Sequence, residues 1–332
     1  MMGKTSKKNT KSKKRKTFSI RELIELSIVV AIGILATALP TSQAAFDGSG
    51  VHHPELRPVR FIPQLIKKVN LLKQLQTAHQ VSLFFENLRT GQQFGTQENE
   101  EFDAASLGKV PLMIAILKAS ESKPELLDMR IQFLRETCEQ VRNYQIIAPA
   151  SVLEDRQFYS VDELLYRLIV HSDNTAICLL RSLATPEQTV NVLAAAGITL
   201  LSPSQSSWKI SPKRYSGLLR ILYNSTYLSP ANSLKALQLL SRSAFHNGLS
   251  AGVPRNVPVS HKFGEWGLGK TEFHDCGIIY MPGSPYILCI MTEGENFERL
   301  IASVADLSRL IFDDISSPER IQPSAWTATK RN

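Results

Sequence analysis

Cysteine is scarce in this sequence. The chain of 332 residues contains four, at positions 138, 178, 276 and 289, too few to hold a protein of this size together as a disulfide scaffold. Their spacing matches no metal-binding pattern, so we expect neither a metal nor another cofactor. Three of the four lie in apolar runs, where a free cysteine behaves as a small hydrophobic residue. In an oxidising compartment, two of them could still form a disulfide.

Acidic residues are absent from the first 21 positions, which hold nine lysines and arginines. The formal net charge of the whole chain is +8, so the remaining residues carry a net charge near −1. The basic character therefore belongs to a tail and not to a face of the folded protein. We expect no nucleic-acid partner.

The apolar run that follows this tail, Leu26–Pro40, is short. Its 15 or so residues reach roughly 22 Å as a helix, less than the ~30 Å hydrocarbon core of a bilayer. A basic stretch followed by such a run is the arrangement of an export signal with its N-terminus in the cytoplasm. Small residues at Ser42 and Ala44 favour cleavage, and a membrane anchor over residues 26–44 is the alternative. We therefore expect an exported protein, either membrane-anchored or released into the cell envelope.

The rest of the chain has the composition of a globular protein, with 43% hydrophobic and 20% charged residues over the full length. It contains no internal repeat. We expect the protein to be a monomer. The predicted organisation is a basic tail (1–25), a signal or anchor (26–44), a linker (45–62), one globular domain (63–316) and a C-terminal tail (317–332).

Periodicity separates helical from extended segments within the globular domain. The predicted strands are residues 81–87, a second strand after the turn at 89–92, and the runs 257–264, 272–281 and 286–292. The predicted helices are residues 63–80, several stretches between 109 and 228, and an amphipathic helix over 297–313. Strands from both ends of the chain must then share one sheet. The predicted fold is α+β, with an antiparallel five-stranded sheet flanked by the N- and C-terminal helices and an all-helical subdomain inserted.

Ser106 and Lys109 are three residues apart, in the segment Phe-Asp-Ala-Ala-Ser-Leu-Gly-Lys. If Ser106 opens a helix, Lys109 lies on the same face and its amine can take the proton of the serine hydroxyl. Ser120 with Lys123, and Ser206 with Lys209, have the same spacing, so the pattern alone is weak. Small residues before Ser106 and an apolar helix after it distinguish the first pair.

Two further segments contain residues of the same chemistry. Ser172-Asp173-Asn174 lies between two apolar helical stretches, and it could equally be a helix cap. Lys262-Phe263-Gly264 lies in an extended run, where a lysine is usually a solvated edge residue.

In this order the three segments match the motif set of one enzyme class. The chain resembles the class A β-lactamase-like serine hydrolase family, which includes penicillin-binding proteins and D,D-peptidases. The resemblance covers about residues 63–316. It also extends to Val-His-Ser-Asp-Asn-Thr-Ala at 170–176 and His-Asp-Cys-Gly-Ile-Ile-Tyr at 274–280. It implies the β-lactamase/D,D-peptidase fold and a β-lactam or D-alanyl peptide as substrate.

The resemblance also implies a role for each residue. Ser106 would be the nucleophile, Lys109 its base, and Ser172 the donor of a proton to the leaving nitrogen. Asn174, Lys262 and Gly264 would bind substrate, and Asp173 would be structural. The backbone N–H groups of Ser106 and Glu265 would form the oxyanion hole.

The chain departs from the family pattern in two places. Class A β-lactamases place a glutamate after the Ser-Asp-Asn motif to activate water, whereas Glu187 is the only acidic residue here between Asn174 and Lys262. It occupies what reads as the first turn of a helix. Phe263 also replaces a residue whose hydroxyl would bind a substrate carboxylate, a contact worth about 1.5–3 kcal/mol.

These departures leave three functions open. The first is a serine hydrolase that is acylated by β-lactams and deacylates slowly. The second is a D,D-carboxypeptidase or transpeptidase acting on peptidoglycan peptides, and the third is a penicillin-binding sensor domain without turnover.

Overall fold

The computed structural model describes residues 61–75, 77–142, 146–149, 151–199 and 208–317. The predicted basic tail and signal or anchor therefore lie outside the described residues, as do most of the linker and of the C-terminal tail. Within the described ranges, no helix combines the length and the apolarity needed to cross a membrane.

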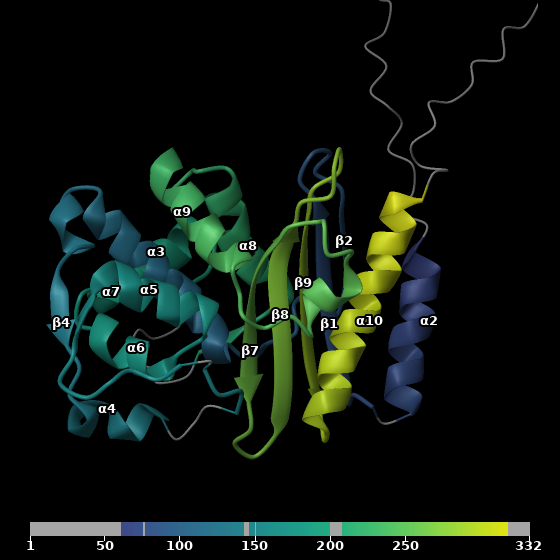
Figure 1. Ribbon diagram of the computed structural model, residues 1–332. Helices are drawn as coiled ribbons and strands as arrows, with labels where there is room; N and C mark the ends of the chain where they lie inside the picture. Colours follow the sequence, from purple (N-terminus) through teal and green to yellow (C-terminus); the bar gives the residue numbers. More distant parts are fainter. Residues whose placement is uncertain (1–60, 76, 143–145, 150, 200–207, 318–332) are drawn as a thin grey trace, which may run out of the picture. The chain divides into compact units, whose positions relative to one another are not determined.

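A five-stranded antiparallel sheet forms the centre of the structure, in the order β2-β1-β9-β8-β7 (Figure 1). Its strands are β1 (Gln80–Asn87), β2 (Gln93–Thr96), β7 (Val259–Trp266), β8 (Thr271–Ile279) and β9 (Tyr286–Gly294). Strands from both ends of the chain meet where β1 pairs with β9. β1 and β9 are largely apolar because both faces of the sheet are covered, whereas β8 also buries polar residues such as His274 and Asp275. The predicted fold class is thus confirmed.

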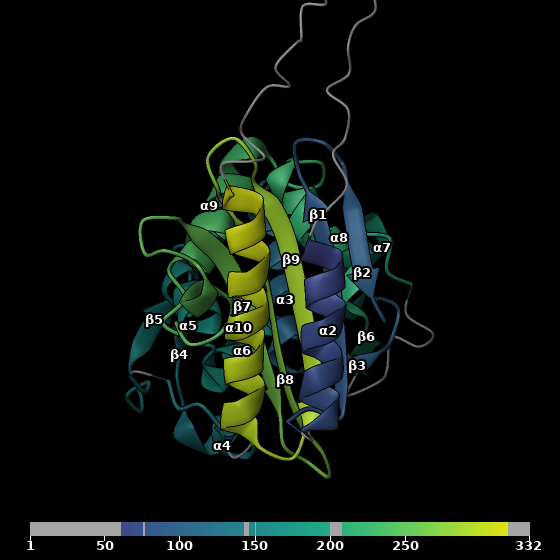
Figure 2. The same cartoon turned by 90° about the vertical axis from the view of Figure 1, so that its right-hand side faces the viewer.

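Helices α2 (Phe61–Gln74) and α10 (Phe297–Ser316) lie side by side over one face of the sheet (Figure 2). Asn296 caps α10 by accepting a hydrogen bond from the Arg299 N–H. The sequence predicts that α2 continues to residue 80, but it ends at Gln74. The His79 N–H already donates to the Glu293 carbonyl in the sheet, and the same amide cannot also serve a helix.

The other face of the sheet is covered by the segment inserted between β2 and β7 (Figure 1). Its helices are α3 (Lys109–Ser120), α4 (Arg135–Arg142), α5 (Val161–Val170), α6 (Asn174–Leu180), α7 (Pro186–Ala195), α8 (Pro212–Tyr223) and α9 (Pro230–Ser241). It also contains two short strand pairs, β3 (Phe102–Asp103) with β6 (Lys209–Ile210), and β4 (Arg130–Gln132) with β5 (Phe158–Ser160). Two hydrophobic cores result, one on each face of the sheet.

All four cysteines are paired. Cys138 of α4 bonds to Cys178 of α6, and Cys276 of β8 bonds to Cys289, its direct neighbour across the sheet in β9. The sequence left this pairing open. It depends on strand register and helix packing, which bring residues distant in sequence into contact.

Candidate active site

Ser106 lies in η1 (Ala105–Gly108), a 3₁₀ turn that leads directly into α3. In such a turn, side chains three residues apart eclipse one another, and the Lys109 Nζ lies 2.9 Å from the Ser106 Oγ. Ala105, just before the serine, has a left-handed φ of 47°. Residues other than glycine adopt that conformation at a cost, mostly at functional sites. The predicted Ser106–Lys109 contact is therefore present, although a 3₁₀ turn precedes the helix.

The amine of Lys109 is buried and has four oxygen neighbours. Besides Ser106, it contacts the Ser172 Oγ at 2.9 Å, the Asn174 Oδ1 at 2.8 Å and the Ser172 backbone carbonyl. A neutral amine has two N–H groups and one lone pair. If the two carbonyl oxygens accept its two hydrogens, the lone pair is left for the hydrogen of a serine hydroxyl. The arrangement thus suits Lys109 as a proton acceptor.

Ser172 lies between two lysines. It occupies the junction of α5 and α6, where the sequence predicts it, with a left-handed φ of 53°. The Lys109 Nζ lies 2.9 Å from its Oγ and the Lys262 Nζ lies 2.8 Å from the same atom. One hydroxyl therefore connects the two amines and can receive a proton from one side while it donates on the other.

Burial lowers the pKa of both lysines because a charged amine loses its hydration. The pKa of Lys109 falls well below its usual value, first through desolvation and then through the nearby charge of Lys262. Desolvation likewise lowers the pKa of Lys262, to about 7, against the attraction of Asp275 and Glu265. Lys109 is thus easier to deprotonate than an exposed lysine, and Lys262 is partly charged at neutral pH.

The two residues after Lys262 have different surroundings. The Phe263 ring is buried in the core on the α10 face of the sheet, 4.5 Å from the Phe245 ring centroid. The Lys262 Nζ lies 4.0 Å from the centroid of this ring. Gly264 lets β7 approach the nucleophile turn, since a Cβ there would lie 3.1 Å from Leu107 Cγ and 3.3 Å from the Ala104 carbonyl oxygen. Phe263 thus packs beneath the lysine, whereas Gly264 permits close contact.

Asp173 caps α6 by accepting a hydrogen bond from the Thr175 N–H at 2.8 Å. This geometry accords with the structural role expected for it. Asn174, the first residue of α6, contacts Lys109. The structure thus brings Ser106, Lys109, Ser172, Asn174 and Lys262 together from three separate parts of the chain.

The other residues with the Ser-x-x-Lys spacing are placed differently. Ser120, at the end of α3, is buried and donates to the Leu117 carbonyl at 2.7 Å, while Lys123 is exposed. Ser206 lies outside the described residues. Glu187 is exposed in the first turn of α7, as the sequence predicts.

Sequence reasoning missed two side chains beside the site. Trp208 lies against η1, with its Nε1 only 3.3 Å from where a Cβ on Gly108 would be, and its carbonyl accepts from the Ala104 N–H. The carboxylate of Glu265 binds the backbone N–H groups of Ile146 and Ile147. The sequence offered one signal for Glu265, since an acidic residue directly after Lys-x-Gly in a buried strand needs hydrogen-bond donors. The sequence assigned a role only to its backbone.

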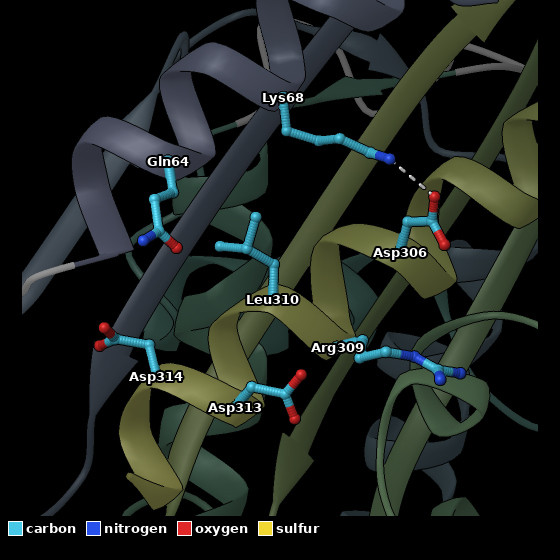
Figure 3. A pocket seen from close by; sticks show the side chains of 7 residues that line it. All are labelled: Gln64, Lys68, Asp306, Arg309, Leu310, Asp313 and Asp314. Carbon is cyan, nitrogen blue, oxygen red and sulfur yellow. Dashed lines mark hydrogen bonds and ion pairs between the residues drawn. The ribbon is translucent and has the colours of Figure 1, made fainter.

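A hollow of about 520 Å³ lies elsewhere, between α2 and α10 on the opposite face of the sheet (Figure 3). Its lining includes the Lys68–Asp306 ion pair, with 2.9 Å between the charged atoms. It shares no residue with the Ser106 site. Among the described residues, no group of three His, Cys, Asp or Glu side chains is placed to hold a metal ion.

A family model described as the beta-lactamase enzyme family matches residues 64–315. A β-lactamase from Sphaerobacter thermophilus DSM 20745 is similar in structure, with 21% identity and a TM-score of 0.64 over 75% of this chain and 95% of that one. A β-lactamase from Xanthomonas campestris pv. campestris str. ATCC 33913 gives 22% identity and a TM-score of 0.66 over 77% and 99%. A variant of PBP-A, solved as an acyl-enzyme complex with penicillin G, gives 22% and 0.63 over 76% and 97%. At these identities the structures establish the fold. No curated protein sequence matches the chain.

Proposed function

Because this chain belongs to the beta-lactamase enzyme family, we propose that it is an exported serine hydrolase in which β-lactams acylate Ser106. The observation that carries the proposal is the contact of Ser106 with a buried amine of lowered pKa. A hydroxyl beside such a base is the arrangement that nucleophilic catalysis requires.

Acylation then begins when the Lys109 amine takes the Ser106 proton and the Oγ attacks the lactam carbonyl. The C–N bond of the lactam breaks, and the leaving nitrogen receives a proton from the Ser172 hydroxyl. That hydroxyl recovers its proton from the protonated Lys109, 2.9 Å away. Lys109 ends the step neutral, so the proton taken from the nucleophile has moved to the leaving group.

The same site binds the substrate. The backbone N–H groups of Ser106 and Glu265 hold the oxyanion. These two residues can serve together because β7 is an edge strand of the sheet and its Gly264 lies close to η1. Lys262 attracts the substrate carboxylate, and that negative charge raises the lysine's pKa and completes its protonation. Asn174 contacts the amide of the substrate side chain.

Hydrolysis of the acyl-enzyme is proposed to be slow. It needs a water with a base beside it, and a positioned general base contributes about 10²–10⁴-fold. The only acidic side chain between Asn174 and Lys262, Glu187, is exposed at the start of α7. In the part of the chain that the structure describes, no hydrogen bond or ion pair joins it to the site. The acyl-enzyme should therefore accumulate.

Intact-mass spectrometry after treatment with benzylpenicillin tests the nucleophile. We expect one adduct on the wild type and none on Ser106→Ala. Ser120→Ala is the matched control, because it removes a second serine with the same Ser-x-x-Lys spacing, and it should keep the adduct. An adduct that persists in Ser106→Ala would overturn the assignment.

A D,D-peptidase acting on peptidoglycan peptides is the second function. It is favoured by the same lack of a water-activating glutamate between Asn174 and Lys262. Release of D-alanine from a D-alanyl-D-alanine peptide would identify this activity. Covalent labelling by penicillin with neither peptidase activity nor turnover of a chromogenic β-lactam would indicate a sensor domain.

The export proposal draws on the basic tail, the apolar run and two disulfides, which persist in oxidising compartments. N-terminal sequencing of the protein from the cell envelope distinguishes a signal cleaved after Ala44 from an anchor that remains in the membrane. We also expect the protein to be a monomer, which light scattering checks. Recovery of the intact chain in the cytosol would contradict export.

A further inference from the structure

The side chain of Glu265 connects the end of β7 to a distant segment. Its Oε1 accepts from the Ile146 N–H at 2.9 Å and from the Ile147 N–H at 3.0 Å, and its Oε2 accepts from the Ile147 N–H at 3.0 Å. Hydrogen bonds to a charged acceptor are among the stronger ones in proteins. Glu265 is 7% exposed, so these bonds are largely shielded from water.

The segment held in this way places an isoleucine beside the end of β7. The Ile147 side chain packs against the core, whereas that of Ile146 is 50% exposed. The Cδ1 of Ile146 would lie 3.1 Å from a Cβ on Gly267, so this side chain covers the glycine that follows β7. Leu268, the next residue, is 56% exposed. The turn that follows the strand carrying Lys262 is therefore flanked by two exposed apolar side chains.

Glu265 also places a negative charge near both lysines of the site. The negative charges of Glu265 and Asp173 both raise the pKa of Lys109. Those of Glu265 and Asp275 both raise the pKa of Lys262. Removal of the Glu265 charge should therefore lower the pKa of both amines, with Asp173 and Asp275 still in place.

We propose that Glu265 is a positioning residue that latches the 146–147 segment to the end of β7, so that Ile146 forms a wall for an apolar side chain of the acyl donor. The inference rests on the proposed function, since it names the substrate class of the same site. The preferred donor carries an aromatic or branched aliphatic group on the acyl side of the amide.

Acylation rate constants for two penicillins test the wall, one with a phenylacetyl side chain and one with an acetyl side chain. We expect the wild type to prefer phenylacetyl, and Ile146→Ala to reduce that preference about tenfold, the scale of a lost apolar contact. Glu265→Gln should reduce it similarly. Glu187→Gln is the matched control, because it removes an exposed carboxylate outside the site and should preserve the preference.

The pH profile separates a charged latch from a purely structural role. In Glu265→Gln, Lys109 should lose its proton at lower pH, so the acidic limb of the acylation profile should move to lower pH. An unchanged profile together with an unchanged preference would refute the proposal. A loss of rate equal for both penicillins in Ile146→Ala would refute the wall.

Hydrogen exchange tests the latch without any acylation. The Ile147 amide should be protected in the wild type and in Glu187→Gln, and it should exchange faster in Glu265→Gln. If the wild type forms no adduct with either penicillin, the proposed function and the wall fail together, while exchange still decides the latch. Equal protection in all three proteins would overturn the latch even in an active enzyme.

Discussion

Replacement of Lys262 by methionine is expected to stabilise the protein at neutral pH while it impairs the site. The pKa of this lysine falls from 10.5 in the unfolded chain to about 7 in the folded one, because burial removes its hydration. Folding therefore releases a proton from Lys262 when the pH lies between about 7 and 10.5. Stability decreases as the pH falls from 10.5 to 7 and changes no further below that range.

The linkage relation gives the size of this effect. Burial of the lysine costs about 4 kcal/mol at pH 7 and about 2 kcal/mol at pH 9. Methionine removes this cost, but it leaves the Phe263 carbonyl without its 2.8 Å donor, while the Ser172 Oγ loses Lys262 and keeps its contact with Lys109. The loss is about 1–3 kcal/mol and does not depend on pH. The net gain is thus about 1–3 kcal/mol at pH 7, and it shrinks by about 2 kcal/mol at pH 9.

Urea denaturation of Lys262→Met and the wild type at pH 7 and pH 9 measures this difference. Lys123→Met is the matched control, because Lys123 is exposed, and its effect should be small and equal at both pH values. If the free energy of unfolding differs between Lys262→Met and the wild type by the same amount at pH 7 and pH 9, the lowered pKa of Lys262 is refuted.

Four further outcomes are expected. Stopped-flow turnover of a chromogenic β-lactam should show a burst of about one equivalent before a slow steady state, from the missing water-activating base, and fast turnover without a burst would contradict slow deacylation. Gly264→Ala should slow acylation about 10–100-fold with little change in melting temperature, since a Cβ would press on Leu107 and Ala104; an unchanged rate would mean that the close approach is unimportant. Phe263→Thr should destabilise the protein by about 3–5 kcal/mol in urea denaturation and should not speed acylation, because the ring packs in the core, so a stable and faster variant would contradict its placement there. The double variant Cys138→Ala/Cys178→Ala should be less stable by about 2–4 kcal/mol, because this disulfide closes a loop with a sequence separation of 40. An unchanged melting temperature would contradict a stabilising role for this disulfide.

Local patterns were sufficient for the sheet strands and the terminal helices. The run that became β9 is mostly apolar and buried on both faces, so its composition alone identifies it. The runs that became β7 and β8 also bury polar residues, and their short length and flanking turns are what predict them. The end of α2 was wrong because the sheet uses the His79 amide, a competition that no local pattern encodes. The short pairs β3–β6 and β4–β5 were missed, since strands of two or three residues carry no periodicity.

For the site, the amino-acid sequence alone shows which chemical groups are available and in which order they occur. Spacing predicted the contact between Ser106 and Lys109, because residues three apart share a face in any helical turn. The contacts of Ser172 with both lysines join residues separated by 63 and by 90 positions, so only the packing of α5, α6 and β7 produces them.

The tertiary structure alone decided the electrostatics and the surroundings of the site. A lysine's pKa depends on its distance from water and from other charges, which is why Lys262 reads as an ordinary edge residue until its burial is known. Phe263 is directed into the core by the pleat of β7 and its packing against Phe245. The Glu265 carboxylate finds its partners 118 and 119 residues away, because burial in a strand leaves a charged side chain stable only where it meets donors.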